Sequence, residues 1–203
     1  YFPLRIDTYE TIVDSGGPGK FRGGNGIRIG YRFLEPGEVS IHDDRWLTYP
    51  WGVNGGLPGS RSRKLLQRAD GSETLLPSKT DRVKVEPGDL LVYETWGGGG
   101  CGDPLERELE KVAFDVEAGL VSEEGARRYG VVISRGRVDA KATAELRARM
   151  ARERGPVQLF DRGFKDIAEL KSRCKAETGL EPPAAPQFQA RRRAARRAAA
   201  GGG

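Results

Sequence analysis

The sequence predicts an α+β fold, with a β-rich amino-terminal half and segregated carboxy-terminal helices. Of the 29 glycines, 19 lie before Asp103, where they separate short runs of alternating apolar and polar residues that are typical of strands. From Asp103 onward, apolar residues recur with the spacing of a helix. This change of period predicts a glycine-rich β domain over residues 1–102, a helical region packing on it over residues 103–186, and a basic Ala/Arg/Gly tail over residues 187–203.

Short strands are expected throughout the first half of the chain. In residues 27–33 every second residue is Ile, Tyr or Phe, which predicts a half-buried strand. Asp70 and Gly71 lie between two further runs and predict a hairpin. The predicted strands cover residues 2–9, 27–33, 38–42, 64–68, 73–76 and 83–95, the last of these divided by a turn at residues 86–89.

Helix start and stop signals follow one another in the second half. Asp103 is a predicted N-cap with Pro104 at the first helical position, and Gly119 ends that helix. Three further helices are expected: from Ser122 to about Tyr129, from Asp139 to Gly155, and from Asp166, with Glu169 as its capping partner, to Gly179. Residues 131–133 are a candidate strand. These short helices need another element on which to bury their apolar faces, and we expect them to pack on the β half.

Length and composition favour a globular chain. At 203 residues and 37% hydrophobic, the chain can bury a real core. We see no apolar segment of membrane-spanning length and no signal peptide, so we expect a cytoplasmic protein without membrane contact. Two cysteines do not make a disulfide framework or a zinc site. Because the chain opens at Tyr1 without methionine, in a strand-like run, we expect a processed product or a piece of a longer polypeptide.

The formal charge of +5 is confined to the end of the sequence. Basic and acidic residues balance at 13 each up to Gly102 and at 16 each over residues 103–186. The excess is five arginines within residues 187–203. This pattern predicts a disordered, solvated tail and no specific binding of nucleic acid, with contact to an acidic partner as the alternative.

Four consecutive glycines at residues 97–100 lie between the last predicted strand and the Asp103 helix start. Backbone N–H groups without side-chain cover, next to a helix start, suit an anion or allow another backbone to approach closely. The candidate residues for this loop are Gly98, Gly99, Gly100 and Gly102. The alternative is a tight corner packed under other parts of the chain.

The sequence offers few groups for catalysis. His42 is the only imidazole, and it shares the polar side of its strand, so we expect it at the surface. The neighbouring Asp43 and Asp44 point to opposite faces and cannot join it around one metal ion without a sharp turn. Cys101 lies in an exposed glycine setting near a helix start, yet a base to activate it is not evident. We therefore assign no catalytic residue and no metal ligand.

Two further stretches are candidates for contacts. Residues 16–26 superficially resemble a phosphate-binding loop, but Phe21 follows the Gly-Lys pair where Ser or Thr is required, and strand residues follow the loop. Lys20 and Arg22 in this loop are candidates for binding a carboxylate or a neighbouring subunit. Trp51, within the aromatic and glycine-rich residues 46–59, is a candidate interface residue, with burial against the sheet as the alternative.

Several of these stretches, taken in order and at consistent spacing, carry a family resemblance. From about Phe2 to about Met150 the chain resembles the carboxy-terminal part of the B-type subunit of the hydantoinase/oxoprolinase family, which is related to subunits of acetone and acetophenone carboxylases. The stretches are residues 14–19 and 21–24, then 50–52 with 55–56 and 58–59, then 76–79, 87–89, 97–107, 119–122 and 126–131.

The resemblance implies a multi-subunit, ATP-dependent enzyme that hydrolyses a cyclic amide of the hydantoin or 5-oxoproline type. It implies ATP with Mg on a partner A-type subunit, and metal ligands in the amino-terminal part of the B-type subunit. This chain lacks that part, so we expect it to bind no cofactor, to be inactive alone and to belong to a hetero-oligomer. The alternatives are a subunit of an ATP-dependent ketone carboxylase and a non-catalytic scaffold or interaction module.

Overall fold

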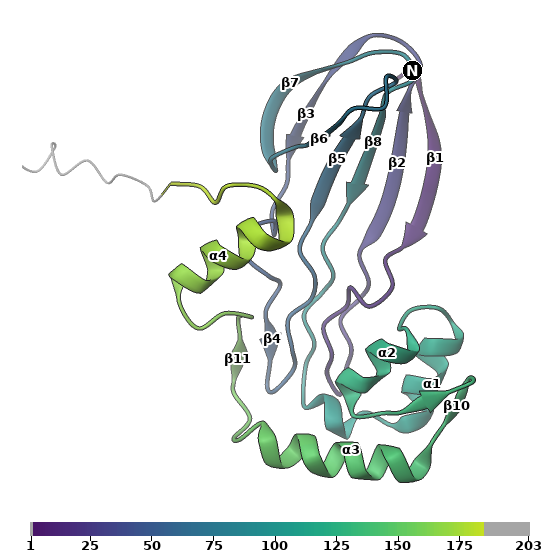
Figure 1. Ribbon diagram of the computed structural model, residues 1–203, viewed down its shortest axis with the longest axis vertical. Helices are drawn as coiled ribbons and strands as arrows, with labels where there is room; N and C mark the ends of the chain where they lie inside the picture. The colour runs from purple at the N-terminus through teal and green to yellow at the C-terminus, as the bar shows by residue number, and fades with distance from the viewer. Residues whose placement is uncertain (1, 185–203) are drawn as a thin grey trace, which may run out of the picture.

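The computed structural model describes residues 2–184, and its largest element is a five-stranded antiparallel sheet at one end of an elongated molecule (Figure 1). The strand order is β1-β2-β8-β5-β6. The strands are β1 (Leu4–Thr11), β2 (Ile27–Phe33), β8 (Leu90–Glu94), β5 (Arg63–Gln67) and β6 (Glu73–Leu75). The predicted strand at residues 27–33 and the hairpin around Gly71 are confirmed.

A two-stranded ribbon forms a second layer over part of this sheet. It consists of β3 (Gly37–His42) and β7 (Lys79–Val85). Between ribbon and sheet lies a cluster of buried apolar side chains that we call the sheet core: Ile41, Leu66, Leu76, Val85 and Leu91. The alternation seen in the sequence places these side chains on inward faces, because successive strand residues point to opposite sides.

The opposite face of the sheet carries ion pairs over β1, β2 and the end of β8, beside the apolar pair of Leu65 and Val92. The Arg28 guanidinium bonds the carboxylates of Glu94 at 2.8 Å and Glu10 at 2.7 Å. Arg32 bonds Asp7 at 2.7 Å. Antiparallel sheets commonly bury one face and leave the other in water, and this sheet follows that division.

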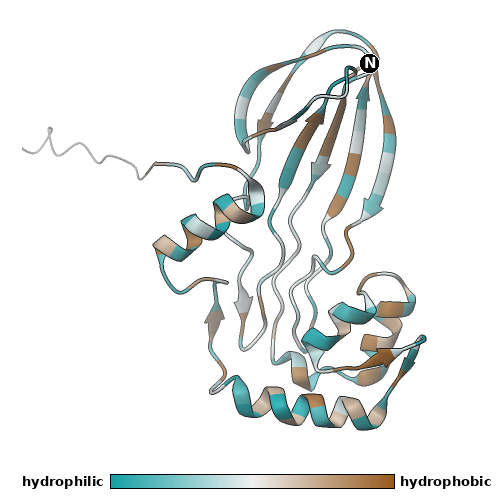
Figure 2. Ribbon diagram, in the orientation of Figure 1, coloured by the Kyte–Doolittle hydropathy of each residue, from teal (hydrophilic) through white to brown (hydrophobic). Residues whose placement is uncertain are grey.

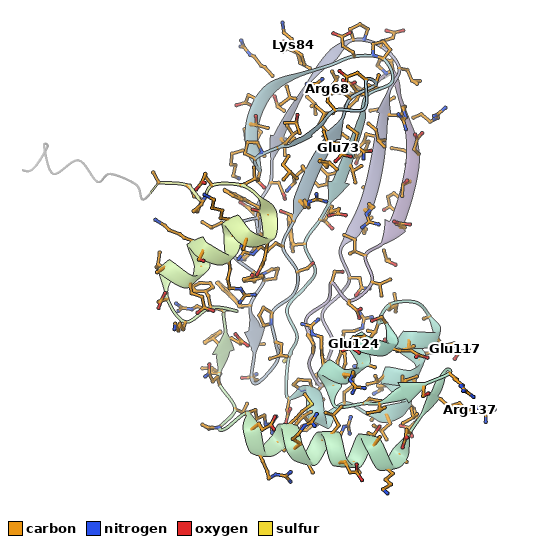
Figure 3. The ribbon with its side chains drawn as sticks, in the orientation of Figure 1. Arg68, Glu73, Lys84, Glu117, Glu124 and Arg137 are labelled. Carbon is orange, nitrogen blue, oxygen red and sulfur yellow. The ribbon has the colours of Figure 1, made fainter. Side chains whose placement is uncertain are left out.

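Beneath the sheet its strands continue as long irregular segments that lead to a helical region at the other end of the molecule (Figure 1). This region contains η1 (Pro104–Glu106), α1 (Leu109–Glu117), α2 (Glu123–Ala126), η2 (Arg127–Tyr129), β9 (Ile133–Ser134), β10 (Arg137–Val138) and α3 (Ala140–Glu153). Its own apolar core consists of Val112, Val121, Ala126, Tyr129, Val131 and Ile133. Charged side chains such as Lys84 on β7 and Arg137 on β10 point away from the body (Figure 3).

The chain then returns to the β half. Strand β11 (Phe160–Asp161) pairs with β4 (Gly52–Val53), and α4 (Ile167–Thr178) follows. The Tyr49 ring contacts two guanidinium groups, with its centroid 4.1 Å from that of Arg61 and 4.9 Å from that of Arg173, and its hydroxyl donates to the Glu177 carboxylate. The sequence predicted the last helix but not the pairing of β11 with β4, because a two-residue strand is too short to show an alternating pattern.

The α+β class is confirmed, and most predicted elements are present with ends shifted by a few residues. The candidate strand at residues 131–133 was wrong for its first two residues, because β9 begins only at Ile133. The Asp139 and Asp166 side chains accept hydrogen bonds at the starts of α3 and α4, and Gly179 ends α4 in the left-handed conformation. Asp103 caps as predicted, but its helix is a single 3-10 turn. The chain is extended at Arg107, because that residue contacts other segments through its side chain and its carbonyl.

Candidate functional site

Three irregular segments lie between the sheet and the helical region, and together they form what we call the glycine layer: residues 15–26, 50–60 and 96–103. Their backbones are joined laterally. The Gly17 N–H donates to the Gly98 carbonyl at 2.8 Å, and the Gly98 N–H donates to the Gly24 carbonyl at 2.8 Å. The Gly100 N–H donates to the Leu57 carbonyl at 2.9 Å. The layer is therefore held by peptide groups, and its intermediate hydropathy gives it pale colours between the two ends of the molecule (Figure 2).

Close backbone contact explains the need for glycine at these positions. A Cβ atom added to Gly97 would lie closer than 3.0 Å to the Ser15 carbonyl oxygen. The same holds for Gly99 against the Trp51 carbonyl and for Gly100 against the Pro18 carbonyl. Real Cβ atoms do not make such approaches, so any side chain at these positions forces two segments apart.

The hydrogen bonds favour the close-approach interpretation of the glycine loop over anion binding. The N–H groups of Gly98, Gly100 and Gly102 all donate to backbone carbonyls inside the glycine layer. At the following helix start, the Asp103 carboxylate accepts the Leu105 N–H at 2.9 Å. The positive end of this short 3-10 turn thus already faces a carboxylate of the chain itself.

Lys20 and Arg22 belong to the glycine layer, and their side chains contact the helical region. The Lys20 ammonium is half exposed and lies 3.2 Å from the Glu106 carboxylate. The Arg22 side chain is largely buried, with its Nη1 donating to the Asn25 side chain at 2.9 Å and its Nε lying 3.4 Å from the Asp115 carboxylate. Both residues meet carboxylates, and these carboxylates belong to the same chain.

Trp51 lies at the surface, in keeping with its candidacy for an interface. Its side chain is 50% exposed, and the Arg45 guanidinium lies 5.1 Å from the ring centroid. Cation–π contacts of this kind hold an exposed ring in place. The ring of Trp51 thus contacts Arg45, whereas the side chains of Lys20 and Arg22 contact Glu106 and Asp115.

A buried charge cluster that sequence reasoning missed joins the layer to the helices. Asp115 on α1 is buried and pairs with Arg107 at 2.8 Å as well as with Arg22. The Arg107 guanidinium lies over the Tyr129 ring, and burial raises the pKa of Tyr129 to about 12. The signal was the acidic Asp115 on a helix face between Val112 and Val116, since a buried carboxylate requires a partner.

Asp14 makes a second connection between the two ends of the molecule. Its backbone has a positive φ of 62°, and its carboxylate accepts the Ser122 N–H at 2.9 Å and the Ser122 hydroxyl at 2.5 Å. Ser122 is itself the confirmed N-cap of α2. The two contacts fix the start of α2 against the segment that follows β1.

A third buried network lies beside the sheet core. The Lys64 ammonium pairs with the Asp43 carboxylate and donates to the hydroxyls of Ser62 at 2.8 Å and Ser78 at 3.1 Å. Burial lowers the pKa of Lys64 to about 8, and the positive charge of Lys79 adds to this lowering. Every partner of Lys64 belongs to the strands and loops around it, so the network stabilises the packing of this region.

The candidate catalytic groups stay apart. His42 is exposed, as predicted, and its ring contacts the Asp81 carboxylate at 2.9 Å. Cys101 forms isolated β-bridges with Phe21 and Val53 within the glycine layer.

Among residues 2–184 there is no group of three or more His, Cys, Asp or Glu side chains placed to hold a metal ion. Within the same residues, none of the helices has the length and apolar character needed to cross a membrane.

The fold and the glycine layer define a β-rich module whose central segments pack through bare backbone. Residues 1–104 match the family model of hydantoinase B/oxoprolinase. The chain belongs to this family, which confirms the resemblance found in the sequence.

Curated relatives and solved structures agree with this assignment. The B-type component of a putative D-/L-hydantoinase from Pseudomonas sp. (strain NS671) is 35% identical over 150 residues, which cover 72% of this chain and 25% of the relative. The caprolactamase β-chain of Pseudomonas jessenii is 36% identical over 154 residues, covering 72% and 26%. The chain thus spans about a quarter of the length of the relatives it matches.

Two solved structures share the fold. The ATP-dependent caprolactamase from Pseudomonas jessenii matches with a TM-score of 0.60 and 34% identity, covering 72% of this chain and 26% of that one. A nucleotide-free acetone carboxylase structure matches with a TM-score of 0.62 and 22% identity, covering 86% and 27%.

Proposed function

We propose that this chain is the structural portion of a B-type subunit in an ATP-dependent, multi-subunit enzyme that hydrolyses a cyclic amide of the hydantoin or 5-oxoproline type. The observation that carries the proposal is its alignment, at 35% and 36% identity, with the hydantoinase and caprolactamase relatives over 72% of its length. The glycine layer supports a structural role, because the N–H groups of Gly98, Gly100 and Gly102 donate to carbonyls of the chain and its charged side chains pair within the chain.

The reactive groups are proposed to come from other polypeptides of the complex. The described residues offer no ligand set for a divalent metal, and the loop at residues 16–26 uses its peptide groups for packing. This chain is therefore given no part in binding the metal or ATP. An A-type subunit is proposed to bind ATP with Mg, and the amino-terminal part of the B-type subunit is proposed to bind the divalent metal. A cytoplasmic location stays a prediction.

A ketone carboxylase subunit is the second candidate. The observation that favours it is the larger share of this chain, 86% against 72%, that the acetone carboxylase fold covers. The acetone carboxylase alpha subunit of Xanthobacter autotrophicus is also 29% identical over 200 residues. The sheet, the glycine layer and the helices are compatible with a subunit of either enzyme.

Substrate trials on the assembled complex separate the two candidates. The complex, purified with its companion subunits, is given a hydantoin, 5-oxoproline or an aryl ketone with bicarbonate, and product and ATP consumption are followed. We expect ATP-coupled ring opening with a cyclic amide, and neither amidase nor ATPase activity from the 203-residue chain alone. ATP-coupled carboxylation of the ketone without ring opening supports the second candidate, and turnover by the isolated chain contradicts the structural role.

A further inference from the structure

The apolar face of the five-stranded sheet is only half covered by the β3–β7 ribbon. The sheet core lies over β8 and β5, with Leu66 and Leu91 fully or almost fully buried. Strand pairing places six more apolar side chains of β1 and β2 on the same face, and we call them the open face: Leu4, Ile6, Tyr9, Ile29, Tyr31 and Phe33. Leu4 lies opposite Phe33, Ile6 opposite Tyr31, and Tyr9 opposite Ile29.

The open face is most accessible to solvent on β1, whereas Tyr31 and Phe33 on β2 are half-buried and pack against the edge of the sheet core. Tyr9 is 70% exposed and Ile6 is 46% exposed. Next to them, an open groove of about 530 Å³ lies between β2 and the ribbon, lined by Tyr31, Phe33 and Val39 among others. Scattered apolar residues on a surface are ordinary, whereas a continuous patch with an adjoining groove marks a contact site.

The geometry points to this open face as the docking surface for the amino-terminal part of a B-type subunit, an inference that rests on the function proposed above. The matched region covers about a quarter of each relative, so about three quarters of the relatives' length lies outside it. An antiparallel sheet covered by a complete second layer buries one whole face. The second layer leaves β1 and the adjoining side of β2 uncovered, so the additional polypeptide completes it there.

The occupant packs on the face and does not extend the sheet as a sixth strand. Strand β1 is an edge strand, but its register is interrupted by a bulge between Ile6 and Thr8. It also carries the charged Arg5 and Glu10, both exposed. Bulges and charges of this kind protect an edge against pairing with another strand. On the reverse face, Arg28 and Arg32 already pair with carboxylates of the same chain. The open face is therefore the surface of β1 and β2 that is suited to an apolar contact.

Co-expression tests the inference without requiring either part to fold alone. A tagged copy of the full 203-residue chain is produced together with the Pseudomonas jessenii caprolactamase β-chain from which the matching quarter has been deleted. We expect this fragment to co-purify with the chain. The amount of fragment that co-purifies with the double variant Ile6→Lys and Tyr9→Arg should be lower by a factor of about ten or more than with the unaltered chain, because aromatic side chains dominate the binding energy of such contacts.

A matched control uses an exposed aromatic residue far from the open face. Phe114 on α1 is 64% exposed, and Phe114→Arg should retain as much fragment as the unaltered chain. All three chains should melt at the same temperature when purified alone, since the altered side chains are exposed.

Each outcome has a separate meaning. If fragment co-purifies equally with the Ile6→Lys and Tyr9→Arg variant, the docking surface is wrong while the proposed partner stands. If it fails to co-purify with the unaltered chain, the partner proposal fails and takes the docking surface with it. If the unaltered chain alone is a dimer that the double variant converts to a monomer, the occupant is a second copy and the inference is overturned.

Discussion

The sheet core and the glycine layer lie one after the other along the molecule, but side chains hold the first together and backbone groups hold the second. In the sheet core, the side chains of Leu66, Val85 and Leu91 interlock between two β layers. In the glycine layer, peptide groups of Gly17, Gly98 and neighbouring residues bond one another directly. A side-chain core can repack around a changed shape, whereas two bonded backbones have no freedom to move apart.

This difference predicts how each region responds to substitution. Apolar burial is non-directional, so a core depends mainly on the volume and hydrophobicity of its residues. Backbone contact depends on the absence of a side chain, so a single methyl group suffices to break it. The glycine layer should therefore be the least tolerant part of the chain.

The largest effect is expected for Gly97→Ala. Its new methyl group would overlap the Ser15 carbonyl, which belongs to a bonded segment. We expect a loss of more than about 4 kcal/mol in the free energy of unfolding, or no folded protein. The control is Gly24→Ala, where an added Cβ meets no atom within 4 Å, and it should change stability by less than about 1 kcal/mol. Urea unfolding measures both, and equal losses would remove the distinction between the regions.

A smaller effect is expected in the sheet core. Leu66 is fully buried, and Leu66→Ala should cost about 2 to 5 kcal/mol because it leaves a cavity. Leu66→Met nearly conserves volume and should cost less than about 1.5 kcal/mol. The comparison is made by thermal and urea unfolding. If methionine costs as much as alanine, the sheet core is as rigid as the glycine layer.

The smallest effect concerns a polar contact at the end of the sheet. Burial of Asp89 works to raise its pKa, but hydrogen bonds from the Glu86 N–H, from Arg68 and from the Ala69 N–H outweigh it, so the pKa lies below the usual value of 3.8. The ionised carboxylate therefore stabilises the fold above pH 4, and this contribution is lost as the pH falls through the lowered pKa.

Asp89→Asn should lower the free energy of unfolding at pH 7 by about 1 to 3 kcal/mol, because it removes charged hydrogen bonds. The gap to the unaltered chain should narrow when urea unfolding is repeated at pH 3 and below, since protonated Asp89 resembles asparagine. A gap that is constant with pH would show that the charge of Asp89 has no part in stability.

Local signals accounted for most of the elements and little of the candidate site. The caps at Asp139 and Asp166 and the strand at residues 27–33 depend on residues close in sequence, and all three were predicted correctly. The partners of Arg22 and Asp14 lie about a hundred residues away along the chain, so no local pattern identified Asp115 or Ser122 as their contacts. The same holds for the pairing of β4 with β11.

The amino-acid sequence by itself determined the α+β class, the periods and ends of the main elements and the family of the chain, because these follow from neighbouring residues and ordered motifs. Only the tertiary structure decided the use of the glycines. Residues 97–100 are bare because Ser15, Trp51 and Pro18 approach them from two other segments. Such contacts depend on how distant segments fold together, so the sequence around a glycine does not show which backbone segment will pack against it.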